Sequence, residues 1–255
     1  MDSSHDVLSF RPEEHAPTTP EGFRPHPLRG PFNALFFTAL DRYLDHLLRP
    51  HKQSLFGNLP PTVVELGPGV GANLRYLRAG TRLIAVEPNP AMHERLRARA
   101  ARAHIDLELH TTGAESLDLP DASVDAVLSS LVLCTVADPA TVVAEVHRVL
   151  RPGGRYAFLE HVAAPDGTAL RRLQRASRRP WGWTFEGCSC ERDLQAVVEA
   201  AGFAETDIDA YRLRSPFLQV NTQIAGVARK GVRRHPRLHR NANALPVHGE
   251  PAGRS

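Results

Sequence analysis

Residues 62–71, T-V-V-E-L-G-P-G-V-G, constrain the fold more than any other part of the chain. The first five are mostly β-branched or apolar, which predicts a short buried strand. The glycines after them predict a tight loop, and A-N-L-R-Y-L-R-A then predicts a helix. Glycine lets the backbone approach a ligand closely, and amides at a helix start favour polar or anionic groups. This strand, loop and helix therefore predict a nucleotide-like ligand site on an α/β fold.

Two acids narrow the ligand class. Residues 82–86 predict a second strand, and Glu87 directly after it is placed to accept hydrogen bonds from ribose hydroxyls. A dinucleotide fingerprint would have its last glycine at position 72, where this chain has Ala72, a residue that the fingerprint tolerates. Glu65, two residues before the first glycine, and the G-x-G-x-G spacing differ from that fingerprint and count against the dinucleotide interpretation.

Composition excludes several classes of protein. A chain of 255 residues, 42% of them hydrophobic, can bury one sizeable core, and its net charge of +3 does not by itself imply nucleic acid. Cys134, Cys188 and Cys190 are too few and too poorly spaced to predict a disulfide framework or a zinc site, so no metal is expected. No apolar run reaches the roughly 18 residues of a membrane span, and the first 30 residues lack a signal-peptide core. We expect a cytoplasmic protein without a membrane span.

Strands and helices alternate along the chain, which predicts an α/β fold. We expect a Rossmann-like, doubly wound, mostly parallel seven-stranded sheet with flanking helices and an N-terminal cap helix. The expected strands are 62–66, 82–86, 105–109, 123–129, 155–161, 206–213 and 223–229. The expected helices are 31–50, ended by Pro50, 89–103, 138–150, a basic helix at 170–179, and 190–201, capped by Ser189. The expected domains are a disordered segment at 1–30, the catalytic domain at 31–230 and a basic disordered tail at 231–255.

Four motifs in one order carry a resemblance to a known family. They are V-V-E-L-G-P-G-V-G, A-V-E-P-N-P, G-A-E-S-L-D-L-P-D-A-S-V-D-A-V-L-S-S and H-R-V-L-R-P-G-G-R-Y-A-F-L-E-H-V. From about residue 32 to 230 the chain resembles class I S-adenosylmethionine (SAM) methyltransferases of the methyltransferase-11 or ubiquinone-methyltransferase type. L-V-L-C-T-V, F-L-E-H-V and W-T-F-E-G-C are most similar to the alkyl thiol methyltransferase-like group. Members of that group carry an N-terminal membrane anchor, and this chain departs from them there.

The resemblance implies SAM as the cofactor and a set of residues that bind it. The glycines would pass under the methionine part, Glu65 would lie near its amino group, and Glu87 would hold the ribose. The implied cofactor-binding residues are Glu65, Gly67, Pro68, Gly69, Gly71, Glu87, Pro88, Asn89, Ala114, Glu115 and Ser130.

The methyl acceptor is expected to be small and apolar or aromatic, with transfer to an O, S or C atom. Aromatic residues at 31–50 and 162–187 would line its pocket; they are Phe32, Phe36, Phe37, Trp181, Trp183 and Phe185. No catalytic residue is assigned. His161 is a candidate general base, and a packed or supporting histidine is the alternative interpretation.

Two other functions stay open on the sequence alone. A nicotinamide-dependent oxidoreductase would share the sheet, but it needs a different glycine spacing and a second catalytic domain. An RNA-directed methyltransferase would use the basic segment 229–240 for phosphate contacts. The chain has no RNA-binding module, and S-L-V-L stands where amino-group methylation of bases would need an N-P-P-Y/F tetrapeptide, so nucleic acid is not an expected partner. The oligomeric state is left open.

Overall fold

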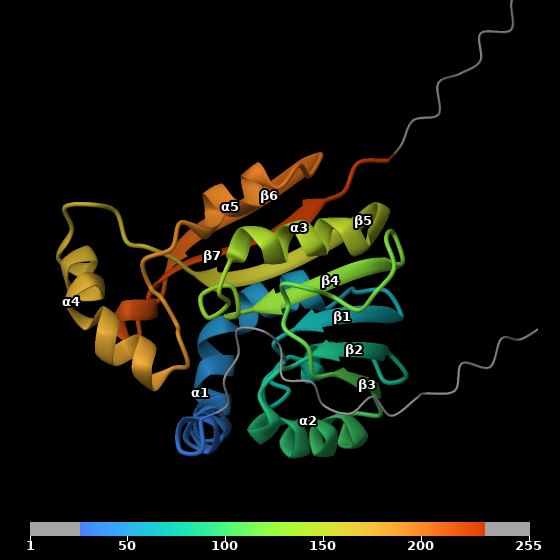
Figure 1. The fold of residues 1–255 in the computed structure, drawn as a ribbon, viewed down its shortest axis with the longest axis horizontal. Helices are drawn as coiled ribbons and strands as arrows, with labels where there is room; N and C mark the ends of the chain where they lie inside the picture. The colour runs from blue at the N-terminus through green and yellow to red at the C-terminus, as the bar shows by residue number, and fades with distance from the viewer. Residues whose placement is uncertain (1–25, 233–255) are drawn as a thin grey trace, which may run out of the picture.

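The computed structural model describes residues 26–232, and the expectations for 1–25 and 233–255 lie outside the described residues. A seven-stranded sheet with the order β3-β2-β1-β4-β5-β7-β6 forms the centre (Figure 1). The strands are β1 (Thr62–Leu66), β2 (Arg82–Val86), β3 (Asp106–His110), β4 (Val124–Ser130), β5 (Leu150–His161), β6 (Glu205–Arg212) and β7 (Thr222–Arg229). The helices are α1 (Arg29–Phe56), α2 (Pro90–Arg102), α3 (Pro139–Val149), α4 (Ala169–Thr184) and α5 (Leu194–Ala200).

The first five strands are parallel and only β7 breaks this direction. It pairs antiparallel with both β5 and β6, so the predicted mostly parallel sheet is confirmed. The carboxyl ends of β1, β2, β4 and β5 meet at one edge of the sheet, where ligands of open α/β folds bind. The segments that follow these strands therefore converge, although they are far apart in sequence.

Helices cover both faces of the sheet (Figure 1). On one face, the buried valines of α3 and α5 pack on β4 and β5 around Tyr156 and Phe158. On the other face, Phe56 at the end of α1 and Leu96 of α2 pack on β1 and β2. These two apolar layers fix the strands in place and so set the positions of the loops at the carboxyl edge.

The expected helix directly after the glycine loop is absent. Residues 72–78 form turns and a short 3-10 helix, Leu74–Tyr76. The side chains of this segment bind other elements: Asn73 turns inward to Glu65, while the Tyr76 hydroxyl donates to Asp45 of α1. Because α1 covers this side of the sheet, the short crossover between β1 and β2 needs no full helix of its own.

Three helix boundaries also differ from expectation, and one of them is the end of α4, which continues past Arg179 and through Pro180 to Thr184. Pro50 does not end α1, which continues to Phe56 and ends at Gly57. The later turns of α1 bury Lys52 and Phe56, and this packing outweighs the cost of a proline inside a helix. In the last helical segment Asp193, not Ser189, is the cap residue, because its side chain accepts from the Ala196 amide at 3.1 Å.

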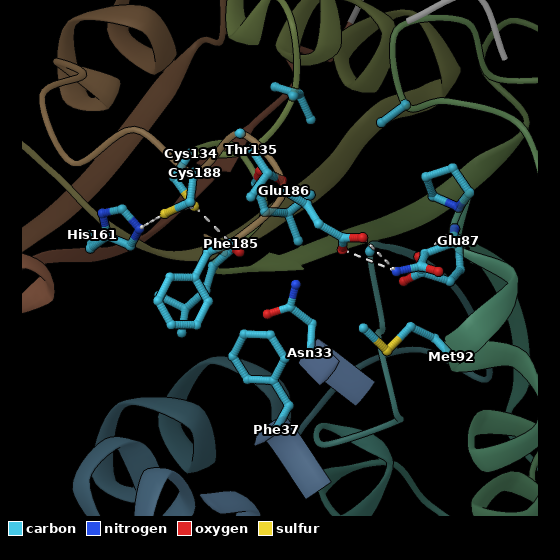
Figure 2. A pocket seen from close by; sticks show the side chains of 18 of the residues that line it. Asn33, Phe37, Glu87, Met92, Cys134, Thr135, His161, Phe185, Glu186 and Cys188 are labelled. Atoms are coloured by element: carbon cyan, nitrogen blue, oxygen red, sulfur yellow. Dashed lines mark hydrogen bonds between the residues drawn. The ribbon is translucent and has the colours of Figure 1, made fainter. Parts of the chain in front are cut away.

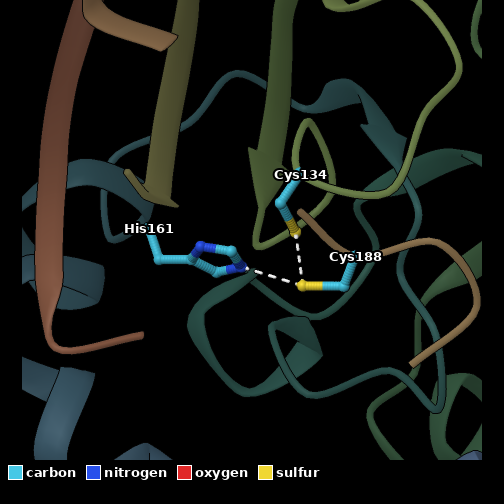
Figure 3. Close-up of side chains that lie close together, drawn as sticks. All are labelled: Cys134, His161 and Cys188. Carbon is cyan, nitrogen blue, oxygen red and sulfur yellow. Dashed lines mark hydrogen bonds between the residues drawn. The ribbon is translucent and has the colours of Figure 1, made fainter. Parts of the chain in front are cut away.

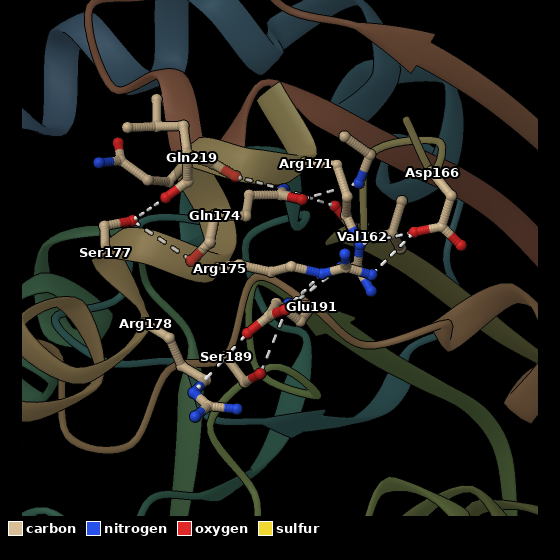
Figure 4. A network of polar contacts seen from close by, with 12 residues as sticks. Val162, Asp166, Arg171, Gln174, Arg175, Ser177, Arg178, Ser189, Glu191 and Gln219 are labelled. Carbon is tan, nitrogen blue, oxygen red and sulfur yellow. Dashed lines mark hydrogen bonds and ion pairs between the residues drawn. The ribbon is translucent and has the colours of Figure 1, made fainter. Parts of the chain in front are cut away.

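The basic helix α4 is anchored by a polar network at the carboxyl edge of the sheet (Figure 4). Gln174 is fully buried and bonds the Ala164 amide and the carbonyls of Val162 and Gln219. Two acids, Asp166 and Glu191, form ion pairs with the α4 arginines; these are Arg171, Arg175 and Arg178. Much of the positive charge of α4 is therefore paired within the chain.

Within residues 26–232, no helix is both long enough and apolar enough to cross a membrane.

Candidate active site

A cavity of about 640 Å³ lies at the carboxyl edge of the sheet. This volume is within the range of about 300–1,000 Å³ typical of small-molecule and cofactor sites. Glu87 lies at one end and the His161–Cys188 pair at the other, with Phe37 and Phe185 between them (Figure 2). The cavity can therefore hold two different groups side by side, one near Glu87 and one near the sulfur atoms.

The glycine-rich loop after β1 is tied to Glu87. The Gly69 amide donates to Oε2 of Glu87 at 2.9 Å, and the Asn89 amide donates to Oε1 at 2.9 Å. Gly69 has φ +56°, and a Cβ at this position would meet no atom within 4 Å. The loop thus leaves open space above its backbone. Burial raises the pKa of Glu87 to about 7, although these two backbone hydrogen bonds act in the opposite direction.

Glu65 lies fully buried beneath this loop. Asn73 donates to its Oε1 at 2.8 Å, whereas its Oε2 has no partner among the described atoms. Burial raises the pKa of Glu65 to about 7, against the hydrogen bond from Asn73 and the charge of Lys52. Lys52 is itself buried, which lowers its pKa to about 8. The unpaired oxygen of Glu65 is therefore a buried acceptor with capacity for one more donor.

Only part of the predicted cofactor set lines the cavity. The lining members are Gly67, Glu87, Pro88, Asn89, Ala114 and Glu115, and His161 also lines it. The other members, Glu65, Pro68, Gly69, Gly71 and Ser130, lie outside the cavity lining. Gly71 has a packing reason to be glycine, since a Cβ there would come within 2.7 Å of Leu74.

The Ala114–Glu115 loop is joined to the loop after β4. Glu115 accepts a hydrogen bond from the Ala137 amide at 2.8 Å, so its carboxylate holds two cavity walls together. Ala114 is 7% exposed and belongs to the main apolar cluster. The small alanine side chain in this place leaves room beside it for a planar group.

Glu186 is a cavity residue that the sequence did not single out. Both of its carboxylate oxygens accept from Nδ2 of Asn89, at 3.0 and 3.2 Å, and it has the unusual φ of +50°. This contact joins the segment after α4 to the start of α2. The W-T-F-E-G-C motif contains Glu186, but nothing in its local pattern places that side chain next to Asn89.

Aromatic rings form the middle of the cavity. Phe36 is the centre of the group, with ring centroids 5.4 Å from Phe37 and 5.3 Å from Phe185. Two of the expected aromatic residues do not line the cavity: Phe32 is 48% exposed and Trp183 is 65% exposed. They lie on the outer side of α1 and α4, and Phe32 stacks on Phe36 from there.

The end of the cavity opposite Glu87, called the inner end below, brings together residues from three segments (Figure 3). The Sγ atoms of Cys134 and Cys188 are 3.6 Å apart, and Nε2 of His161 is 3.2 Å from Sγ of Cys188. Trp181 donates from Nε1 to the same sulfur at 3.2 Å. Nε2 of His161 is thus already in contact with Cys188. This favours the interpretation that His161 supports the cysteine over the interpretation that it is a free general base.

Cys188 and His161 shift each other's pKa at this end of the cavity. Hydrogen bonds from Cys134 and Cys190 hold the pKa of the Cys188 thiol well below its usual value, although burial opposes them. Burial alone would lower the pKa of His161, but the charge and hydrogen bond of Cys188 outweigh it and raise that pKa. The contact between the two side chains therefore favours the charged form of each.

Comparisons with known proteins identify the family of the chain. A methyltransferase domain family matches residues 64–158. The thiol S-methyltransferase TMT1B of Rattus norvegicus is 35% identical over 172 residues, covering 66% of this chain and 70% of the relative. Human thiol S-methyltransferase TMT1A is 32% identical over 190 residues, covering 70% and 78%.

Solved structures show the same fold. A SAM-dependent methyltransferase from Thermotoga maritima, described as a possible histamine N-methyltransferase, has a TM-score of 0.55 and 18% identity, covering 79% of this chain and 99% of its own. A putative methyltransferase of Haloferax volcanii, in complex with the activator Trm112, has a TM-score of 0.59 and 20% identity, covering 79% and 97%.

The chain belongs to the class I SAM-dependent methyltransferases, and SAM is its cofactor. The described residues fit this cofactor: the loop at Gly69 leaves open space, and Glu87 and Glu65 offer buried carboxylates. The oxidoreductase alternative has no support from these comparisons.

Proposed function

We propose that this methyltransferase transfers the methyl group to the sulfur atom of a small apolar or aromatic thiol. The observation that carries this proposal is the inner end of the cavity, where an aromatic wall leads to Cys134, His161 and Cys188. Relatives named as thiol S-methyltransferases support the choice of sulfur.

The choice of sulfur also follows from acidity. A thiol ionises near pH 8.5, whereas a phenol ionises near pH 10. The protein therefore needs to stabilise the anion of a thiol less than that of a phenol before it can act as a nucleophile. The His161 ring and the Trp181 indole already contact the Cys188 sulfur. We infer that an N–H donor such as the Trp181 indole stabilises the negative charge of an acceptor sulfur placed beside it.

For the cofactor, we infer that the Glu87 carboxylate accepts hydrogen bonds from the ribose hydroxyls. The unpaired oxygen of Glu65 lies below the glycine loop, where a donor on the methionine part would find it. The adenine would lie near Ala114, with Asn89 and Pro88 beside it.

The chemical step requires the acceptor to be aligned with the methyl group, and it requires no nucleophile from the protein. When bound, the cofactor supplies a methyl group that is already activated by a sulfonium. Phe36, Phe37 and Phe185 hold the acceptor in line and keep water away from it. The free thiols of the described residues fit a compartment that keeps cysteines reduced, which supports the cytoplasm as the proposed location.

Replacing Phe36 by alanine should weaken acceptor binding without affecting the cofactor. Phe36 lines the cavity and contacts the rings of Phe37 and Phe185, so its removal opens the aromatic wall. The KM for an aromatic thiol should rise about tenfold, since burial against a phenyl ring contributes on the order of 1–3 kcal/mol. Steady-state kinetics with thiophenol, and calorimetry with S-adenosylhomocysteine (SAH), measure the two effects.

Phe32→Ala is the matched control, because this ring is half-exposed and lies outside the cavity. It should leave the KM nearly unchanged. Equal changes in KM for the two variants would contradict the placement of the acceptor against the Phe36 ring.

A further inference from the structure

The inner end of the cavity has the composition of a metal site. Cys134 follows β4, His161 ends β5, and Cys188 follows α4, yet their ligand atoms all lie within 4.8 Å of one another (Figure 3). All three side chains are buried. Thiolates and imidazoles are typical zinc ligands, whereas magnesium and calcium prefer oxygen ligands.

Two of the three separations between these atoms are close to those of a tetrahedral site. With Zn–S near 2.3 Å and Zn–N near 2.0–2.1 Å, a tetrahedron needs about 3.8 Å between two sulfurs and about 3.5 Å between sulfur and nitrogen. The observed separations are 3.6 Å from Cys134 to Cys188 and 3.2 Å from Cys188 to His161. These two separations are within a few tenths of an ångström of the tetrahedral values, and the third, between Cys134 and His161, is no more than 4.8 Å.

The surrounding contacts hold these side chains in place. The Ser189 amide donates to the carbonyl of Cys134 at 2.8 Å, which ties the two cysteine-bearing segments together. Arg192 donates to the carbonyls of Leu133 and Val136, each at 2.7 Å, and fixes the loop after β4. The Trp181 indole donates to Sγ of Cys188, as outer partners of metal-bound thiolates commonly do.

We propose that Cys134, His161 and Cys188 bind a zinc ion whose fourth position faces the cavity. All three residues line the cavity wall, and three protein ligands with one open position are typical of catalytic rather than structural zinc. Two thiolates balance the charge of the ion, so the site is neutral in its buried setting. Cys190 belongs to the same apolar cluster but neither lines the cavity nor belongs to the converging group.

The fourth position suits the sulfur of the acceptor, an assignment that rests on the proposed function. A thiol that coordinates zinc loses its proton to solvent and binds as a thiolate. A lone pair of this sulfur forms the new bond to the methyl carbon. The bond from that carbon to the sulfonium breaks, and its electron pair stays on the departing thioether sulfur. The methylated product is a neutral thioether, a weaker ligand than a thiolate, and it leaves.

Metal analysis of the full chain tests the site without any methyl acceptor. Protein purified without chelator and dialysed against zinc should retain about one equivalent per chain. Cobalt(II) in place of zinc should give thiolate-to-cobalt charge-transfer absorption together with intense tetrahedral visible bands. Cys134→Ser and Cys188→Ser should each remove part of the charge-transfer absorption, and His161→Ala should weaken retention of the metal at least tenfold.

Cys190→Ser is the matched control, because it removes a buried thiol of the same cluster and should leave the cobalt spectrum unchanged. SAH affinity, which depends on the other end of the cavity, reports whether each variant is folded. A wild-type protein without cobalt–thiolate bands would overturn the site, as would loss of the bands in Cys190→Ser alone. A Cys134–Cys188 disulfide in metal-free, anaerobically purified protein would also overturn it. Metal binding without thiol methylation would instead count only against the proposed acceptor.

Discussion

Glu87→Ala is expected to weaken SAH binding by about 1.5–3 kcal/mol, a factor of roughly 10–150 in Kd. The proposed contact with the ribose hydroxyls disappears, and the amides of Gly69 and Asn89 lose their acceptor as well. The glycine loop therefore becomes less ordered, so the effect on binding exceeds that of one lost contact. Calorimetry with SAH measures the affinity, and thermal unfolding reports whether the protein is folded. An unchanged Kd in folded protein would remove Glu87 from the site.

The same residue predicts a pH dependence of cofactor binding. Burial raises the pKa of Glu87 to about 7 in the free protein, and hydrogen bonds from two hydroxyls favour the ionised carboxylate. SAH affinity should therefore be full above this pH and decrease as the pH falls through about 7. Glu87→Gln keeps one acceptor oxygen but cannot titrate. Its affinity should be lower at high pH, and this part of the pH dependence should be absent.

Glu160→Ala should lower the free energy of unfolding by about 2–4 kcal/mol, because it leaves buried donors without an acceptor. Glu160 is fully buried in β5 and accepts from the Ser129 hydroxyl at 2.9 Å and from the Val132 amide at 2.9 Å. It thereby positions the loop after β4, which carries Cys134. Urea denaturation measures the loss of stability.

Glu160→Gln serves as the control for this change, since its amide oxygen can still accept a hydrogen bond. It should lose less than half as much stability as the alanine variant. Equal losses would show that the carboxylate charge, and not the acceptor geometry, holds the loop.

The central strands β1, β2 and β4 were predictable because each is a short apolar run bounded by turn residues. The expected bounds of β1 and β2 match the structure, and the Asp138 cap of α3 is confirmed by its hydrogen bond from the Ala140 amide. The segment after the glycine loop was not predictable in this way. Its side chains bind Glu65 and α1, and such distant contacts override local helix propensity.

In the candidate site, too, some positions follow from local sequence and others depend on contacts between distant segments. Glu87 directly follows a strand, so its place at the edge of the sheet could be read from the sequence. Cys134 and Cys188 are 54 residues apart, and spacing rules for metal ligands apply to neighbours in one loop or hairpin. Only the parallel order of β4 and β5 brings Cys134 and His161 to one place. The contact of Glu186 with Asn89 depends in the same way on how the chain returns after α4.

Transfer of labelled methyl from SAM to matched acceptors tests the central claim most directly. Thiophenol, phenol and aniline have the same ring and differ only in the acceptor atom, and hexanethiol and hexanol extend the comparison to aliphatic chains. We predict methylation of both thiols, with kcat/KM at least a hundredfold above that for phenol, hexanol or aniline. Methylation of phenol or aniline at rates equal to or above those of the thiols would contradict the account.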